Sequence, residues 1–214
     1  MPGSPLNALN VNPPFAEYQF VDINQSRIES LQQVAEQRKN VFIHEGDCNQ
    51  VLLEKVFPRV KFKNYRRGLC LLDPYGLHLD WQVIYTAGQM RSVEIFLNFP
   101  IMDMNMNVLK HNPEDVPSEQ AERMTRFWGD ESWKASAYST SGNLFGYEEK
   151  TDNEAITNAF RARLLNSAGF KYVSQPLAMK NSRDAVVYYL FFASPKPVAE
   201  RIVKDIFKKQ EKRL

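Results

Sequence analysis

Short apolar runs alternate over residues 18–100 with stretches in which apolar residues recur every three or four positions. The runs predict strands at residues 18–23, 41–43, 69–72 and 92–99. The helical spacing predicts a helix that Ser26 caps and that runs to about residue 34, a helix through residues 51–56 and a helix at residues 77–89. This alternation is typical of βαβ units, so it predicts an α/β fold with a mainly parallel sheet and helices on both faces.

The run Leu69–Leu72 contains no polar residue, which favours a strand that is buried on both faces. Asp73-Pro74-Tyr75-Gly76 follows it directly. Pro74 lacks a backbone donor and Gly76 tolerates unusual dihedral angles, so we expect a sharp turn there. Open α/β sheets bind ligands at the carboxyl ends of their strands. The sequence therefore predicts that an acid and an aromatic ring, Asp73 and Tyr75, are presented together at that edge.

Residues 101–150 break the alternation and predict a helical, aromatic-rich insertion within one domain that spans residues 1–214. Residues 102–107 alternate like a strand, but they follow a proline and suit the start of a helix equally well. For Trp128 and Trp133 we expect packing in a satellite hydrophobic cluster. A lid over a substrate and a contact surface for a partner protein are the alternatives.

The last part of the chain predicts three further elements. Thr151 or Asp152 caps a helix, and the segments 170–179 and 185–193 form a hairpin. An amphipathic helix then closes the chain. We therefore expect a C-terminal antiparallel hairpin beside the parallel strands.

Three acids, Asp22, Asp47 and Asp73, each follow a predicted strand at nearly equal intervals along the chain. An ionised carboxylate can accept hydrogen bonds from both hydroxyl groups of a ribose, which makes Asp22 a candidate for holding a nucleoside. After the second strand, Asp47 can accept a hydrogen bond from an adenine amine while Cys48 packs against the ring. Capping of the following helix by Asp47 explains the same residues equally well.

The third acid belongs to the turn with the most specific combination of residues. In Asp73-Pro74-Tyr75 a carboxylate or an exposed carbonyl group can orient a nucleophilic amine, and Tyr75 can stack on a flat group. These three are the candidate catalytic residues, whereas Asp22, Asp47 and Cys48 are the candidate cofactor ligands.

The composition narrows the class of protein. The chain has 214 residues, of which 43% are hydrophobic, with 27 Lys and Arg against 25 Asp and Glu, as in an ordinary globular protein. Two cysteines without CxxC spacing predict no disulfide and no metal site, and without a leader or membrane span the expected location is the cytoplasm. GxxxxGK[ST], HExxH and GxSxG motifs are all absent from the sequence, which argues against P-loop, zincin and α/β-hydrolase chemistry.

The charge of the chain neither predicts nor excludes binding to nucleic acid. A formal net charge of +2 gives no bulk electrostatic case for it. Arg66-Arg67 and the basic tail from Lys204 to Arg213 are the local features that favour it, although a solvated surface explains them as well.

Longer blocks of the sequence resemble a known family. They are GDCN at 46–49, RRGLCLLDPYGLHLDW at 66–81, EIFLNFPIMDMNMN at 94–107, RMTRFWGD at 123–130 and VVYYLFFASP at 186–195. Together with a DPPY-like turn at Asp73, they are similar to class I S-adenosylmethionine-dependent methyltransferases, and within them to the three-Cys-motif partner proteins, from about residue 3 to residue 209. The resemblance implies a Rossmann-like sheet, S-adenosylmethionine as cofactor, and a partner protein that bears three cysteines.

In that family, a strand and a glycine-containing loop precede the segment that corresponds to residues 3–9, and the loop would hold the methionine part of the cofactor. The resemblance therefore implies that this N-terminal strand and loop are missing from the chain. Two functional hypotheses follow. The first is a methyltransferase-like protein that acts on an amine of a nucleic-acid base or of a protein. The second is a non-catalytic scaffold that works with the three-cysteine-motif protein.

Overall fold

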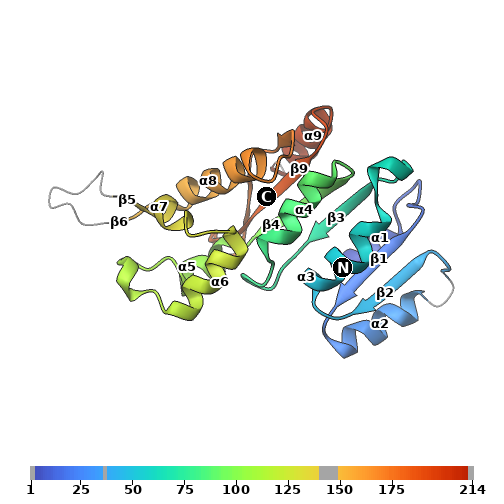
Figure 1. Ribbon diagram of the computed structural model, residues 1–214, viewed down its shortest axis with the longest axis horizontal. Helices are drawn as coiled ribbons and strands as arrows, with labels where there is room; N and C mark the ends of the chain where they lie inside the picture. Colours follow the sequence, from blue (N-terminus) through green and yellow to red (C-terminus); the bar gives the residue numbers. More distant parts are fainter. Residues whose placement is uncertain (1–2, 36–37, 140–148, 212–214) are drawn as a thin grey trace. The chain divides into compact units, whose positions relative to one another are not determined.

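The computed structural model describes residues 3–35, 38–139 and 149–211 of the chain. The chain divides into two compact units, Met1–Arg59 and Val60–Leu214 (Figure 1). Residues 140–148 of the expected insertion and the end of the basic tail lie outside the described residues. None of the described helices has both the length and the apolar character that a membrane-crossing helix needs.

The first unit is built on a pair of parallel strands. Its strands are β1 (Tyr18–Asp22) and β2 (Val41–Glu45), and its helices are α1 (Ser4–Leu9), α2 (Gln25–Ala35) and α3 (Cys48–Val51). A π turn, Leu52–Val56, and a 3-10 turn, Phe57–Arg59, extend α3. The predicted cap of α2 is wrong by two residues, because the Asn24 side chain accepts from the Arg27 N–H over 3.2 Å while Ser26 only donates to Asn24.

The second unit contains a five-stranded mixed sheet. Its strands are β3 (Gly68–Leu72), β4 (Val93–Phe99), β7 (Tyr172–Val173), β8 (Leu177–Lys180) and β9 (Val186–Ser194). The order is β3-β4-β9-β7, and β8 also pairs with β9. The parallel pair β3–β4 and the antiparallel hairpin β8–β9 confirm the prediction. Because β9 is antiparallel to β4, β7 and β8, the expectation of a mainly parallel sheet is wrong for this part.

The remaining elements of the second unit are helical, apart from a short antiparallel pair. The helices are α4 (Trp81–Met90), α5 (Ile101–Asn107), α6 (Ser118–Trp128), α7 (Trp133–Ala137), α8 (Asn153–Asn166) and α9 (Ala199–Glu211), and the pair is β5 (Tyr138–Ser139) with β6 (Glu149–Lys150). Two open questions are thereby answered. The segment 102–107 is a helix, and Asp152 caps α8 by accepting from the Ala155 N–H over 2.7 Å. The helix after β3 starts at Trp81 rather than Leu77, which leaves a longer loop at 73–80.

One face of the sheet carries the main aromatic core. Phe160 of α8 lies against Phe99 of β4, with ring centroids 4.7 Å apart, and against Trp128 at 5.3 Å. Trp128 and Trp133 are each 1% exposed, and their indole N–H groups donate to Ser132 and Thr125. Packing is therefore confirmed as their role, and a partner contact through these two rings is wrong because the protein itself covers them.

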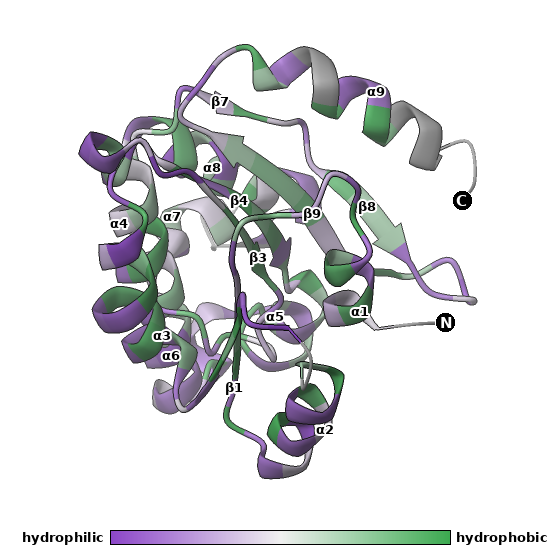
Figure 2. Cartoon of the chain, turned by 90° about the vertical axis from the view of Figure 1, so that its right-hand side faces the viewer, coloured by the Kyte–Doolittle hydropathy of each residue, from purple (hydrophilic) through white to green (hydrophobic). Residues whose placement is uncertain are grey.

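The opposite face of the sheet is only partly covered. Val203 and Phe207 of α9 pack on Leu177 of β8 and Phe192 of β9. Figure 2 shows α9 beside β8 and β9. On β3, Leu69 and Leu71 are 41% and 54% exposed. The prediction of a strand buried on both faces is wrong for this reason. Among the described residues β3 pairs with β4 alone and is an edge strand.

Candidate functional site

The carboxyl ends of β1 and β2 bring the candidate cofactor ligands together. Asp22 is the register partner of Glu45, and the Gly46 N–H donates to the Asp22 carbonyl over 3.0 Å. Gly46 has a φ of +146°, which suits glycine and lets the chain turn directly after the strand. Asp47 and Cys48 follow at once, so this sheet edge presents Asp22 and the second acidic turn side by side.

The Asp22 carboxylate is held in a defined orientation. One oxygen, Oδ1, accepts from the Asn24 N–H over 2.8 Å, and Oδ2 lies 3.4 Å from Arg27 Nη1. The Asp22 side chain is 23% exposed, whereas that of Arg27 is 72% exposed, so the ion pair is a loose surface contact. A carboxylate offers about four lone-pair positions, which leaves acceptors on Asp22 for the hydroxyl groups of a ribose.

Asp47 has a structural role that the sequence left open. Its Oδ1 accepts from the Asn49 N–H over 2.7 Å, so it caps α3. The second carboxylate oxygen remains as an acceptor for a ligand. Cys48, half-buried, is the first residue of α3 and lies directly beside that carboxylate in the chain. Asp22 and Asp47 therefore place two carboxylates, each oriented by a backbone N–H, at this edge.

A histidine on β2 supports the same edge. His44 Nε2 lies 2.8 Å from Gln19 Oε1 on the neighbouring strand. Burial, and then the positive charges of Lys55 and Arg59, lower the pKa of His44 from its usual 6.5. His44 is consequently neutral at pH 7 and adds no charge beside Asp22 and Asp47.

The second group of candidate residues lies at the carboxyl end of the parallel pair β3–β4. Asp73 is exposed, and its Oδ1 accepts from the Asn98 side-chain amide over 2.6 Å. Asn98 is the penultimate residue of β4, and parallel strands end at the same edge. The sequence analysis missed Asn98, although its place near the end of a parallel neighbour was a usable signal.

Tyr75 stands almost free of the protein. Tyr75 is 90% exposed. Its ring stacks on the ring of His78, with the centroids 6.1 Å apart and the planes at 22°. Pro74 is half-buried and sets the backbone between Asp73 and Tyr75. The turn thus presents a carboxylate and a flat aromatic surface to solvent, as the sequence predicted.

An ion pair that the sequence analysis also missed lies directly against Gly76 of the turn. Gly76 has a φ of +57°, and a Cβ at this position would lie 2.8 Å from Asp103 Oδ2. Asp103 of α5 accepts from Asn107 over 2.8 Å and lies 3.6 Å from Arg123 Nη2 of α6. Asp103 Oδ2 and Arg123 Nε are buried without a hydrogen-bond partner. The glycine therefore allows the turn to lie directly against a partly buried charge pair.

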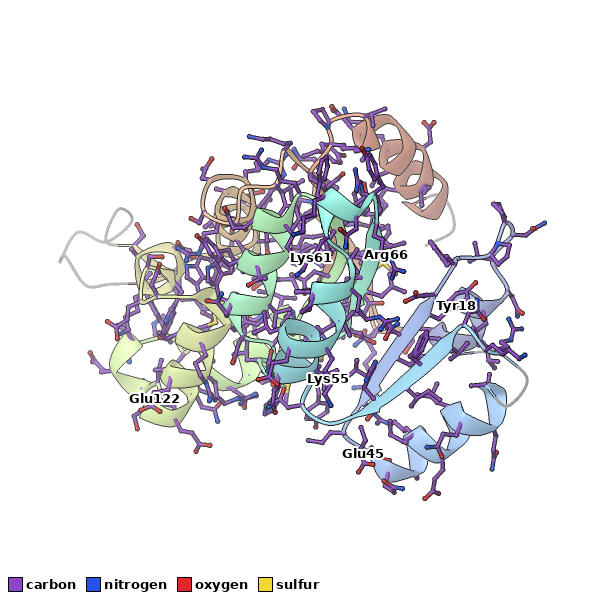
Figure 3. All side chains as sticks on the ribbon, turned by 45° about the vertical axis from the view of Figure 1, so that its right-hand side comes forward. Tyr18, Glu45, Lys55, Lys61, Arg66 and Glu122 are labelled. Atoms are coloured by element: carbon purple, nitrogen blue, oxygen red, sulfur yellow. The ribbon has the colours of Figure 1, made fainter. Side chains whose placement is uncertain are left out.

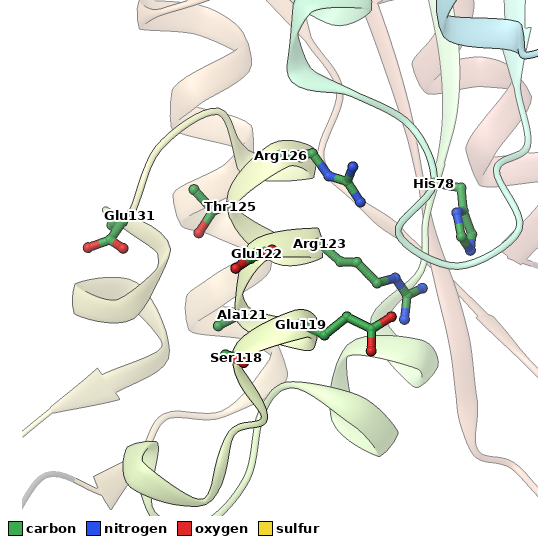
Figure 4. A pocket seen from close by; sticks show the side chains of 9 residues that line it. All are labelled: His78, Ser118, Glu119, Ala121, Glu122, Arg123, Thr125, Arg126 and Glu131. Carbon is green, nitrogen blue, oxygen red and sulfur yellow. The ribbon is translucent and has the colours of Figure 1, made fainter.

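A cavity of about 590 Å³ opens beside the turn. Its lining comes from His78, from α6 and from Glu131, namely His78, Ser118, Glu119, Ala121, Glu122, Arg123, Thr125, Arg126 and Glu131. Figure 4 shows Glu119, Arg123 and Arg126 extending from α6 toward His78, whereas Glu131 points away. A lining of both charge signs suits a polar ligand better than an apolar one.

Within residues 3–35, 38–139 and 149–211, no three His, Cys, Asp or Glu side chains gather closely enough to hold an ion. Comparison with known proteins adds no further assignment, since no family model matches the chain and no curated protein is detectably similar to it. The two sheet edges, one in each unit, are the structural basis for a functional proposal.

Proposed function

We propose that this chain is an S-adenosylmethionine-dependent methyltransferase-like protein of the three-Cys-motif partner type, acting on an amine of a nucleic-acid base or of a protein. The observation that carries the proposal is the Asp73–Tyr75 turn. It presents an exposed carboxylate, oriented by Asn98, next to a 90% exposed ring at the carboxyl edge of a parallel strand pair. An amine on a flat group is the acceptor that this combination suits.

The strand arrangement supports this proposal. A class I methyltransferase sheet is expected to combine parallel strands with a C-terminal antiparallel hairpin. Both parallel pairs, β1–β2 and β3–β4, and the antiparallel β9 with its hairpin partner β8 agree with that expectation. The Rossmann-like assignment rests on this agreement together with the strand-end acids.

In the proposed reaction the first unit binds the nucleoside. Asp22 accepts hydrogen bonds from the ribose hydroxyl groups, and Asp47 accepts one from the adenine amine while Cys48 packs on the ring. When bound, S-adenosylmethionine supplies an electrophilic methyl group. The two turns are suited to this task because their carboxylates are already oriented by backbone N–H groups.

The second unit orients the acceptor. Asp73 accepts a hydrogen bond from the acceptor amine, which holds the nitrogen with its lone pair directed away from the carboxylate. Tyr75 stacks on the plane of the acceptor, and Pro74 holds the turn. Asp73 is exposed, so the proton that the amine loses passes through the carboxylate to water.

Transfer of a radiolabelled methyl group from S-adenosylmethionine to single-stranded oligonucleotides and to peptides tests the proposal. We expect Asp73→Ala to lower the rate at least 100-fold, because the acceptor loses its orientation. Glu114→Ala, which removes an acid from an exposed loop position, is the matched control and should keep full activity. Equal rates for Asp73→Ala and wild type would refute the role of the turn.

A non-catalytic partner of a three-cysteine-motif protein is the second candidate function. The observation that favours it is the edge strand β3, on which Leu69 and Leu71 are exposed. An exposed apolar edge strand can receive a strand from another protein. Leu69→Lys with Leu71→Lys should then abolish co-purification with that protein, and persistent binding would exclude this surface.

A further inference from the structure

The segment between Val60 and β3 has a composition that the proposed reaction does not use. Its sequence is Val60-Lys-Phe-Lys-Asn-Tyr-Arg-Arg67, which places four basic residues around two aromatic rings and contains no acid. Every residue from Lys61 to Arg67 is exposed. Figure 3 labels Lys61 and Arg66 on this segment. A run of this kind is a cationic surface with rings set among the charges.

The two rings are more exposed than packing would require. Phe62 is 52% exposed and Tyr65 is 92% exposed. The guanidinium of Arg67 lies 4.1 Å from the centroid of the Phe62 ring, which places a cation on one aromatic face. A solvated basic loop needs no large apolar rings, so charge alone does not explain this surface.

The segment is fixed to the sheet at both ends. The Ser92 hydroxyl donates to the Val60 carbonyl over 2.5 Å, and the Ser92 carbonyl accepts from the Gly68 N–H over 2.9 Å. Ser92 is 1% exposed, so a buried residue anchors the whole loop. Between these anchors, Phe62–Asn64 forms a 3-10 turn. The rings and charges are therefore presented from an ordered support.

Tyr65 occupies an unusual backbone conformation. It ends the 3-10 turn with a φ of +56°, and its N–H donates to the Phe62 carbonyl over 3.0 Å. This left-handed region favours glycine and is rare for bulky residues. A tyrosine at a position that glycine would fill more easily, and with its ring in solvent, indicates that the ring has a use outside the fold.

We propose that residues 61–67 form a binding surface for single-stranded nucleic acid. Single strands are held by positively charged surfaces on which bases stack against aromatic rings, and the segment supplies both. Phe62 and Tyr65 stack with bases, while Lys61 and Lys63 contact phosphates. An acidic protein would be attracted by the same charges but would give the exposed rings no flat partner.

This surface is distinct from the proposed acceptor turn. The basic segment precedes β3 and Asp73 follows it, so the two lie at opposite ends of a strand that is roughly 16 Å long. The proposal concerns strand binding and does not depend on methyl transfer. Loss of methyl transfer in Asp73→Ala should therefore leave strand binding intact.

Fluorescence anisotropy of a labelled oligothymidine of about 20 nucleotides, titrated with the full chain, tests the proposal. Tyr65→Gly is the informative variant, because it removes the ring while relieving the left-handed conformation, so the loop stays folded. We expect it to weaken binding at least fivefold, as loss of one stacked base does. Lys61→Ala with Lys63→Ala should reduce the slope of log affinity against log salt by about 1.4.

The matched control removes two positive charges elsewhere. Lys180→Ala with Arg183→Ala does so in the exposed β8–β9 hairpin and should leave binding unchanged. Any of three results would overturn the proposal: no binding up to about 100 µM protein at low salt, unchanged affinity in Tyr65→Gly, or equally tight binding of heparin, which is anionic but has no bases.

Discussion

Asn98 holds Asp73 across the parallel pair β3–β4, with its amide nitrogen 2.6 Å from one carboxylate oxygen. The bond joins the ends of two strands that are 25 residues apart in the sequence. It fixes the one acid that the proposed reaction places against the acceptor.

Replacing Asn98 by Asp tests this contact without changing the size of the side chain. Two carboxylates would then face each other, and we expect the free energy of unfolding to fall by about 1 kcal/mol at pH 7. At pH 5 part of this loss should be recovered, because protonation of one acid restores a donor. Urea denaturation followed by tryptophan fluorescence measures both values. Asn64→Asp, in the exposed 3-10 turn Phe62–Asn64, is the control, and equal losses at the two pH values would contradict the expected contact.

Gly76→Ala tests the close approach of the turn to the Asp103–Arg123 pair. The new methyl group would lie 2.8 Å from a buried carboxylate oxygen at a φ of +57°, so both contact and backbone conformation become unfavourable. We expect a loss of about 2 kcal/mol or more in the free energy of unfolding.

Gly3→Ala is a suitable comparison for that experiment, since an added methyl group there meets only Pro5 at 3.7 Å. Similar stabilities of the two variants in urea denaturation would show that Gly76 is not needed for the turn.

The stability of the first unit should depend on pH through His44. Its pKa is lowered in the folded protein, so the unfolded chain binds a proton more readily. The contribution of neutral His44 to the free energy of unfolding is fully present above pH 6.5. It is lost as the pH falls through the lower pKa of His44 in the folded protein. Hydrogen exchange of peptides from β2 should therefore accelerate between pH 7 and pH 5, after correction for intrinsic rates.

His44→Gln should abolish this pH dependence, because glutamine keeps a polar group near Gln19 but does not titrate in this range. The same substitution at exposed His111 serves as the control. An unchanged dependence in His44→Gln would assign the effect to another group.

The sequence predicted the elements that local patterns determine. Apolar runs marked β1 to β4, and the predicted hairpin segments 170–179 and 185–193 contain most of β8 (Leu177–Lys180) and β9 (Val186–Ser194). Asp22, Asp47 and Asp73 were placed at strand ends because Asp73 follows its run directly and the other two lie within a few residues of the end of theirs. The relative directions of the strands in the whole sheet were harder to predict. The antiparallel pairing of β9 with β4 joins residues about a hundred positions apart and leaves no local signal in the sequence.

The missed site residues depend on contacts of the same kind. Asp103 and Arg123 meet beneath Gly76 only because α5 and α6 pack there, and the segment 102–107 had no clear helical pattern. Burial of Trp128 depends on Phe160 in a distant helix. The exposure of Leu69 and Leu71 was not predicted, because an apolar run does not reveal whether a strand lies at the edge of a sheet.

Calorimetric titration of the chain with S-adenosylhomocysteine and with 5′-methylthioadenosine tests the central claim most directly. The second ligand carries adenosine without the amino-acid group, and Asp22, Asp47 and Cys48 are the residues proposed to bind the adenosine part. The account predicts that both ligands bind, and that Asp22→Asn weakens each at least tenfold while Glu29→Gln, on exposed α2, has no effect. Absence of binding by both ligands, or equal affinities in Asp22→Asn and wild type, would contradict it.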